Sequence, residues 1–367
     1  MKRREILLAA ASVAAGAVAG AGAASTLSPP TEPMTSPRAL RMVTTWPRDF
    51  PGLAASAERL ANRIAAGSAG RFSVDVFHAG EAVPPYEAFD AVSTGAAELY
   101  HGAESFWRTK DKAYHFFASI PFGLSSGELS AWLAHGGGQS YWDELSATFN
   151  VKPFLAGHTG MHIGGWFTRE IRTPKDLVGL RVRMPDLAGH VLERLGAVIV
   201  SLPIGEALGA LKSGDLDGVA LYGPWIDRNF GFSAAAPHYY LPDYREPGLA
   251  LSCGINLTLW NGLDDFSRTA IASACAVESA AIQAQFQAEN ALALEELSKT
   301  LGGSPKRLAD PVLAAFAAAS EDVVRDLATS SEAAGRVADS YRIFRRQAVN
   351  WARAADAPYL AGRSAPL

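Results

Sequence analysis

Residues 179–223 read GLRVRMPDLAGHVLERLGAVIVSLPIGEALGALKSGDLDGVALYG and carry the clearest structural pattern of the chain. Short β-rich segments alternate in it with amphipathic helical segments, and Pro185 and the Asp217-Gly218 turn are typical stops between them. The predicted elements are a strand over 179–184, a helix over 187–195, a strand over 198–202, a helix from 203 to about 214, and a strand over 219–222. Alternating strands and helices predict an α/β domain with a mainly parallel sheet.

The chain before this stretch repeats the same rhythm, which indicates a second α/β lobe. Its predicted elements are a strand over 39–46, a helix over 53–66, a strand over 72–77, a helix over 86–94 and an extended segment over 96–102. Residues 267–301 form one helical pattern without Gly or Pro, which at 1.5 Å per residue spans roughly 50 Å. Further helices are expected over 310–355. Two lobes joined by crossing segments leave a cleft between them, where ligands commonly bind.

The composition is that of a globular protein with a sizeable core. The chain has 367 residues, of which 49% are hydrophobic and 19% charged, and its formal net charge is −4. Two domains are expected at this length, and the mild acidity without long runs of basic residues argues against a nucleic-acid partner. The only cysteines, Cys253 and Cys275, are too few for a disulfide framework, and we expect two buried thiols.

The N-terminus has the order of an export signal. Lys2, Arg3 and Arg4 precede a weakly apolar stretch of Ala and Gly that runs to about residue 24. This order predicts a cleavable signal peptide, and the adjacent arginines resemble the twin-arginine type. An uncleaved N-terminal anchor is the alternative. Residues 25–38 are rich in Ser, Thr and Pro and are predicted to be a linker, so we expect an exported protein.

Arg183 is the strongest candidate for chemistry. It lies near the carboxyl end of a predicted strand, and in parallel α/β sheets that end faces the ligand crevice. A guanidinium group offers paired donors that match a carboxylate. Asp186 is an alternative partner, which would make Arg183 part of a structural ion pair.

Other polar and aromatic residues provide weaker signals. His158 and His162 share one face of an extended segment, so both can line the cleft, although about 13 Å of separation is too far for one shared metal ion. Aromatic side chains cluster near predicted strand ends and are either core or cleft residues. The aromatic candidates for the ligand site are Trp46, Phe106, Trp107, Trp166 and Tyr222. None of these residues forms a nucleophile with an oriented base, which favours binding over catalysis.

A serine hydrolase is the alternative function. Residues 123–127, GLSSG, match the G-x-S-x-G pattern of a nucleophile elbow around Ser125, with Asp227 and His238 in the required order downstream. The structural interpretation is a capping box, in which Ser125 and Glu128 together begin a helix.

The motif order resembles the solute receptors of TRAP transporters, the tripartite ATP-independent periplasmic systems. The residues that carry this resemblance are GLRVRMP at 179–185, LG at 195–196, LPIGE at 202–206 and ALKSGDLDG at 210–218. The stretches TTWP at 44–47, FPGL at 50–53, GGWF at 164–167 and EPG at 246–248 are most similar to the branch that binds 2-oxo acids and lactate.

The resemblance implies a two-lobed α/β fold like that of periplasmic binding proteins, with a long helix that spans both lobes. The expected boundaries are a signal peptide over 1–24, a linker over 25–38, lobe 1 over 39–160, lobe 2 over 161–255, a return to lobe 1 with the long helix over 256–301, and C-terminal helices over 302–367. It also implies that Arg183 pairs with the carboxylate of a small organic acid, that the protein is periplasmic and not an enzyme, and that it docks on a membrane permease. A homodimer through the C-terminal helices is compatible with this branch, and a signalling receptor without a permease is a further alternative.

One departure from the 2-oxo-acid branch concerns a metal ion beside the ligand. The positions that hold this ion in the branch correspond here to His162, Ala220 and Leu221, and the last two have no side-chain oxygen for a hard cation. We therefore expect no cofactor and no metal site, with His162, alone or with His158, making direct hydrogen bonds to the ligand. Glu104, expected near the cleft, is the candidate for a substitute metal ligand.

Overall fold

The computed structural model describes residues 37–162, 164–184, 186–242 and 247–363. The predicted signal peptide over 1–24 lies outside the described residues, as does nearly all of the linker. The strands are β1 (Arg38–Thr44), β2 (Phe72–Phe77), β3 (Leu99–Gly102), β4 (Val151–His158), β5 (Gly165–Phe167), β6 (Arg181–Arg183), β7 (Val198–Ile199), β8 (Gly218–Val219), β9 (His238–Tyr240) and β10 (Ala250–Asn256). The α-helices are α1 (Leu53–Gly67), α2 (Ala88–Thr94), α3 (Ser126–His135), α4 (Gly138–Ala147), α5 (Asp186–Arg194), α6 (Ala207–Ser213), α7 (Pro224–Asp227), α8 (Leu257–Gly262), α9 (Asp265–Leu301), α10 (Asp310–Ala328), α11 (Glu332–Ala354) and α12 (Asp356–Arg363).

The first sheet has the strand order β2-β1-β3-β10-β4. β1 pairs in parallel with β2 and β3, whereas β10 runs antiparallel to both β3 and β4. Alternate residues point to opposite faces, so Met42 packs with α1 and α9 while Val43 packs with α2. The carboxyl ends of β1, β3 and β4 therefore lie at one edge of this sheet.

The second sheet has the strand order β7-β6-β8-β5-β9. β6 pairs in parallel with β7 and β8, and β5 pairs antiparallel with β8 and β9. One face, with Trp166, packs against α6 and the end of α9, and the other face, with Phe167 and Val182, packs against α5. The loops after β6 and β8 leave from the same edge.

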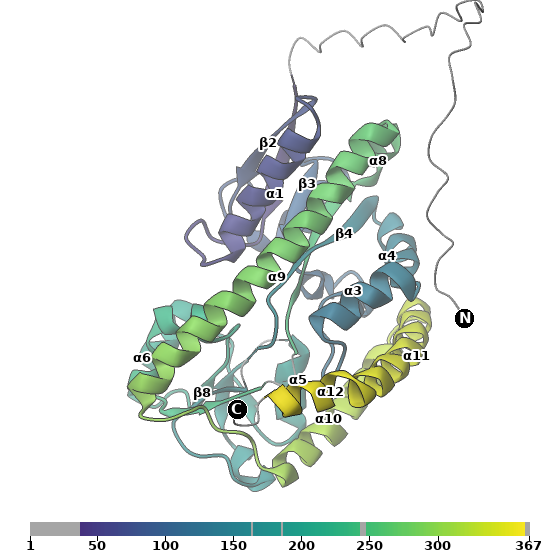
Figure 1. Ribbon diagram of the computed structural model, residues 1–367. Helices are drawn as coiled ribbons and strands as arrows, with labels where there is room; N and C mark the ends of the chain where they lie inside the picture. Colours follow the sequence, from purple (N-terminus) through teal and green to yellow (C-terminus); the bar gives the residue numbers. More distant parts are fainter. Residues whose placement is uncertain (1–36, 163, 185, 243–246, 364–367) are drawn as a thin grey trace, which may run out of the picture. The chain divides into compact units, whose positions relative to one another are not determined.

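Three segments join the two sheets: residues 159–164, residues 241–249 and α9. Figure 1 shows α9 as one long green helix that passes α1 and ends near α6. Asp264 caps this helix by accepting a hydrogen bond from the backbone N–H of Ser267, and Gly302 ends it in the left-handed conformation, with φ of 66°. Burial of Ile271, Ile282 and Phe286 ties α9 to the rest of the unit.

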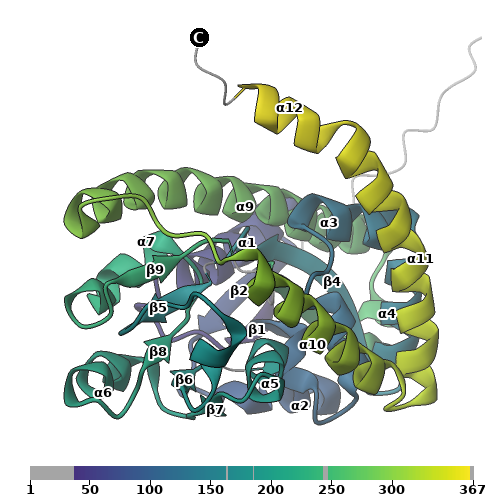
Figure 2. The same ribbon diagram turned by 90° about the horizontal axis from the view of Figure 1, so that it is seen from below.

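The C-terminal helices continue from the second sheet. α10 packs beside α5, α11 packs against α3 and α4, and α12 projects from the end of α11 (Figure 2). Within the described ranges, no helix combines the length and the apolar character that a bilayer span requires.

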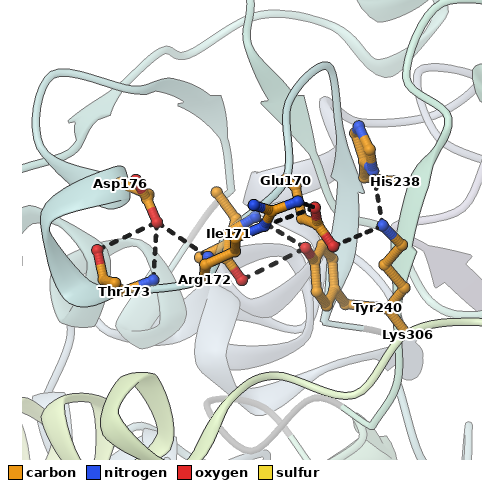
Figure 3. A network of polar contacts seen from close by, with 8 residues as sticks. All are labelled: Glu170, Ile171, Arg172, Thr173, Asp176, His238, Tyr240 and Lys306. Atoms are coloured by element: carbon orange, nitrogen blue, oxygen red, sulfur yellow. Dashed lines mark hydrogen bonds and ion pairs between the residues drawn. The ribbon is translucent and has the colours of Figure 1, made fainter.

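A network of polar contacts anchors the loop between β5 and β6 (Figure 3). The Glu170 carboxylate accepts hydrogen bonds from Lys306 at 2.7 Å and from Arg172 at 2.8 Å, and these hydrogen bonds lower the pKa of Glu170 to about 2. The Tyr240 hydroxyl accepts a hydrogen bond from the backbone N–H of Ile171 at 2.8 Å. These contacts hold the loop between β5 and β6 against β9 and against the segment that leads into α10.

The predicted α/β class and the long helix are confirmed, but both sheets are mixed. The chain re-enters the first sheet from the edge at which β1 and β3 end, so β10 must run opposite to both. This return begins at Ala250, earlier than the expected boundary at 255. Cys253 in β10 and Cys275 in α9 are both buried, and a hydrogen bond between them raises the pKa of the Cys275 thiol.

Candidate functional site

A cavity of about 150 Å³ lies where the carboxyl ends of strands from the two sheets face each other. Loops after β3, β6 and β8 supply most of its walls, and the rest comes from Tyr86, just before α2, and Leu249, just before β10. Its lining residues are Tyr86, Phe106, Arg108, Arg183, Met184, Asp186, Ala220, Leu221, Tyr222 and Leu249. This volume is small compared with the roughly 300–1,000 Å³ of drug-sized ligand pockets, so it suits a small molecule.

Arg183 is the last residue of β6 and lies in the wall of this cavity. Its Nε donates to the carbonyl oxygen of Leu202 at 3.3 Å, and its Nη1 donates to the carbonyl oxygen of Ala220 at 3.4 Å. Both acceptors belong to segments beside β6, so the guanidinium group is supported by backbone from two sides. Arg181, on the same strand, instead pairs with Asp217 at 3.1 Å.

Asp186 follows the same strand and reaches across to the first sheet. Its carboxylate accepts a hydrogen bond from Arg108 Nη1 at 2.8 Å and lies 3.5 Å from the Ser105 hydroxyl. Burial raises the pKa of Asp186, and the charge of Arg108 opposes this rise. The sequence suggested Asp186 as a partner of Arg183, but the hydrogen bonds described for Asp186 go to the loop after β3.

Aromatic side chains form the apolar part of the wall. Phe106 and Tyr222 line the cavity, from the first and the second sheet respectively. Trp46 lies behind Phe106, with ring centroids 5.8 Å apart, and its Nε1 donates to His101 Nδ1 at 2.9 Å. Trp46 therefore fixes the wall from behind instead of lining the cavity.

The two candidate histidines lie at the end of β4, for His158, and in the first crossing segment, for His162. His162 packs edge-on against Tyr222, with ring centroids 5.3 Å apart, and its Nε2 lies 2.6 Å from the Thr159 hydroxyl. His158 accepts a hydrogen bond from the backbone N–H of Gly160 through Nδ1 at 3.0 Å. Burial lowers the pKa of His158 to about 4 and that of His162 to about 3, so both rings are neutral at physiological pH.

Trp107 and Trp166 lie in the cores of the two lobes. Trp107 packs against Tyr100, with ring centroids 5.4 Å apart, on the α2 face of the first sheet. Trp166 stacks on Tyr239 at 3.9 Å and donates its Nε1–H to Asp227 at 2.7 Å. Neither indole is among the residues that line the cavity.

Ser125 caps a helix, which is the structural interpretation of the GLSSG stretch. The Glu128 carboxylate accepts hydrogen bonds from the Ser125 backbone N–H at 2.8 Å and from its hydroxyl at 2.9 Å, at the start of α3. This is the capping-box arrangement. The alternative of a serine hydrolase is therefore not supported.

The three positions that the resemblance matches to a metal site offer few side-chain ligands for a hard cation. Ala220 and Leu221 line the cavity without side-chain oxygens, and the Ala220 carbonyl accepts from Arg183. Glu104 is buried, accepts a hydrogen bond from the Tyr100 hydroxyl at 2.7 Å, and is not among the described residues that line the cavity. Among the residues that the structure describes, no three His, Cys, Asp or Glu side chains gather closely enough to hold a metal ion.

A larger cavity of about 820 Å³ lies between η3 (Lys112–Phe117), α5 and α10. Arg108 borders both cavities, but helices and not strand ends supply the walls of the larger one. We assign the ligand site to the smaller cavity because it contains Arg183 at the carboxyl end of β6.

The sequence did not single out Tyr86, Arg108, Met184 or Leu249 as residues of this cavity, and it suggested Asp186 only as a partner of Arg183. Arg108, Met184 and Asp186 follow the ends of β3 and β6, and strand ends are where ligand contacts gather, so this position is the signal that could have found them.

Comparisons with known proteins agree with this architecture. The family model for bacterial extracellular solute-binding proteins of family 7 (DctP) matches residues 42–331. The chain is 35% identical over 361 residues, 98% of each chain, to the monocarboxylate 2-oxoacid-binding periplasmic protein of Nostoc sp..

Two solved structures share the fold over most of both chains. A TRAP transporter solute-binding protein of Bordetella bronchiseptica, a dimer with calcium and picolinate in its active site, has a TM-score of 0.83 and 29% identity, covering 89% of this chain and 97% of that one. A TRAP periplasmic solute-binding protein of Pseudoalteromonas atlantica, with bound sodium and pyruvate, has a TM-score of 0.83 and 28% identity, covering 90% of this chain and all of that one (100%). Given the extent of these matches, the chain belongs to the bacterial extracellular solute-binding proteins of family 7, the receptors of TRAP transporters.

Proposed function

We propose that this protein is a non-catalytic periplasmic receptor that binds a small 2-oxo or 2-hydroxy monocarboxylate. The observation that carries this proposal is the placement of Arg183 at the end of β6, in the wall of a cavity of about 150 Å³ between the two sheets. Its planar guanidinium group can donate two hydrogen bonds to one carboxylate. The pyruvate in the Pseudoalteromonas relative and the name of the Nostoc relative support the same ligand class.

The apolar wall would then hold the rest of the ligand. Phe106, Leu221, Tyr222 and Leu249 surround the cavity and would exclude water from the carboxylate–arginine contact. A charge-assisted hydrogen bond is stronger in such a water-poor setting. Trp46 and His162 would keep Phe106 and Tyr222 in place.

We further propose that the ligand binds without a bridging metal ion. The relatives contain calcium or sodium, but Ala220 and Leu221 supply no side-chain oxygen here. The neutral imidazole of His162, which packs against the cavity-lining Tyr222, would replace the ion's role by a direct hydrogen bond. His158, bound to Gly160, would support the crossing segment.

Delivery to a TRAP permease follows from the family's role as transport receptors. Export would use the twin-arginine-like signal over residues 1–24. A homodimer through α11 and α12 is also proposed, because Ile343, Trp351 and Tyr359 expose 52%, 67% and 68% of their surfaces there. Light scattering of the purified mature chain would distinguish a dimer from a monomer.

The test of the ligand site is calorimetric titration of pyruvate into the wild-type protein and into Arg183→Ala. Loss of the bidentate contact is expected to weaken binding by about 2–4 kcal/mol, roughly 30- to 1,000-fold. Arg181→Ala is the matched control, because Arg181 lies on the same strand but pairs with Asp217, and it should bind pyruvate normally.

Unchanged pyruvate affinity in Arg183→Ala, with the fold intact by circular dichroism, would refute the site. The same titration with a metal chelator tests the metal: strict dependence of binding on an added cation would contradict the direct contact.

A further inference from the structure

Asp186 combines three features that a surface aspartate does not have. Its backbone φ is 58°, in the left-handed region that costs energy for any residue other than glycine. Its side chain is only 13% exposed. It also lies in the wall of the ligand cavity. Backbone strain that persists at a site is a reason to look for a function there.

The contacts of Asp186 join the two halves of the cavity. Its carboxylate accepts a hydrogen bond from Arg108 Nη1 at 2.8 Å and lies 3.5 Å from the Ser105 hydroxyl. Both partners follow β3 of the first sheet, whereas Asp186 follows β6 of the second. A carboxylate of the protein therefore pairs with one of the two guanidinium groups in the cavity.

The charge of the cavity wall depends on the side chains that line it. Among the described residues of the wall, Arg108 and Arg183 are positive, Asp186 is negative and the others are uncharged. The described part of the wall thus has one anionic side chain, Asp186, and Arg108 already pairs with it. A second carboxylate would enter a small cavity beside Asp186, and like charges in such proximity repel strongly.

We propose that Asp186 is a specificity-determining residue that restricts the ligand to a single carboxylate, by occupying Arg108 and repelling a second anionic group. This inference rests on the proposed function, because it presupposes that the cavity binds an organic acid. Asp186 would select against dicarboxylates by charge repulsion. A repulsive contact of this kind against the wrong ligand is a common source of specificity.

The test uses two acids of equal carbon number, 2-oxopentanoate and 2-oxoglutarate, which differ by a terminal carboxylate. Their affinities are measured by competition with pyruvate in calorimetry. Asp186→Asn removes the charge, and Asn tolerates the left-handed conformation as Asp does. In this variant we expect the affinity ratio to move toward 2-oxoglutarate by about tenfold or more.

A charge cycle separates this effect from a general loosening of the site. Arg108→Gln should move the ratio the other way and weaken both acids, because Asp186 then lacks its partner. The double variant, Asp186→Asn with Arg108→Gln, restores the original net charge and should return the ratio to within about threefold of the wild type. Glu193→Gln, an equal charge change on exposed α5 surface, should leave the ratio unchanged.

The outcomes distinguish the two proposals. An unchanged ratio in Asp186→Asn, in a protein that still binds pyruvate, would overturn the role of Asp186 and leave the proposed function standing. Equal shifts in Asp186→Asn and Glu193→Gln would also overturn it. A wild-type protein that binds none of the three acids would overturn the proposed function, and this inference with it.

Discussion

Asp227 is a carboxyl group enclosed by the second lobe. It is 1% exposed, accepts a hydrogen bond from Trp166 Nε1 at 2.7 Å, and lies 3.3 Å from the backbone N–H of Gly223. Burial raises its pKa to about 7, in spite of these hydrogen bonds. The folded chain therefore binds this proton more tightly than the unfolded chain, in which an aspartate titrates near pH 4.

The pH dependence of Asp227→Asn follows from this raised pKa. The contribution of Asp227 to stability is fully present below the unfolded pKa and is lost as pH rises from about 4 to about 7. Relative to the wild type, the Asn variant should become more stable by about 2–3 kcal/mol between about pH 5 and about pH 8. Urea unfolding at both pH values measures this difference.

Asp217→Asn is the control with the opposite sign. Hydrogen bonds and charge from Arg181 lower the pKa of Asp217, in opposition to its burial. Its contribution is present above the unfolded pKa and lost as pH falls, so Asp217→Asn should lose stability relative to the wild type as pH rises. Parallel pH profiles of the two variants would contradict both assignments.

The sequence predicts the role of a single residue when that role depends on its local position in the chain. Arg183 could be singled out because it lies at a strand end before a proline, and the structure places it in the cavity wall. The pairing of Asp186 with Arg108 could not be predicted, because it joins residues 78 positions apart that only the packing of the two lobes brings together. For the same reason, Trp107 and Trp166 could not be separated from cleft residues by sequence alone.

The attachment of α9 to α1 depends on one buried carboxylate. Glu278 is fully buried, at 0% exposure, and binds the Ser56 hydroxyl at 2.8 Å, Arg59 at 2.7 Å and Arg63 at 3.0 Å. All three partners lie on one face of α1. The long helix is thus held to the first lobe by charge-assisted hydrogen bonds in addition to apolar packing.

Glu278→Gln is expected to destabilise the protein by about 1–3 kcal/mol, because it removes the charge that these donors share and leaves fewer acceptors. Glu295→Gln is the matched control on the same helix: Glu295 pairs only with exposed Lys299 in the described contacts, and such a pair contributes about 0.5 kcal/mol or less. Thermal or urea unfolding of both variants checks the difference, and equal losses would contradict the anchoring role.

The elements themselves differ in how far the sequence determines them. The long helix over 267–301 could be predicted because its pattern is uninterrupted, and the structure extends it only by two residues at its start. β8 ends earlier than expected because residues 220–222 leave the sheet to form the cavity wall, and β6 loses Met184 in the same way but also starts two residues late, at Arg181. The direction of β10 could not be predicted, since it depends on the point at which the chain re-enters the first sheet.

The whole molecule connects its two lobes through a pair of closely packed crossing segments. The backbone N–H of Thr159 donates to the Leu249 carbonyl at 3.0 Å, and the backbone N–H of Leu249 donates to the Thr159 hydroxyl at 2.9 Å. Leu249 is also part of the cavity wall. The spacing of the two crossings therefore affects the cavity directly, and hinge segments of this kind commonly control closure around a ligand.

Gly248 permits this close approach. Its φ is 148°, and a Cβ atom on it would lie 2.1 Å from the Gly160 carbonyl oxygen and 2.4 Å from Cε1 of His158. Gly160 also has a positive φ, 71°, but a Cβ atom there would meet nothing within 4 Å. A substitution at Gly160 therefore tests the effect of backbone conformation alone. A substitution at Gly248 also tests the effect of crowding between the two crossing segments.

Gly248→Ala should therefore push the crossings apart, move Leu249 and weaken pyruvate binding by about tenfold or more, together with a clear loss of thermal stability. Gly160→Ala should cost only about 1–2 kcal/mol from its left-handed conformation and retain pyruvate affinity within about threefold. Calorimetric titration at a temperature where both variants are folded measures the affinities. If Gly248→Ala folds and binds pyruvate as well as Gly160→Ala does, the spacing of the crossings does not control the cavity, and closure must depend on α9 instead.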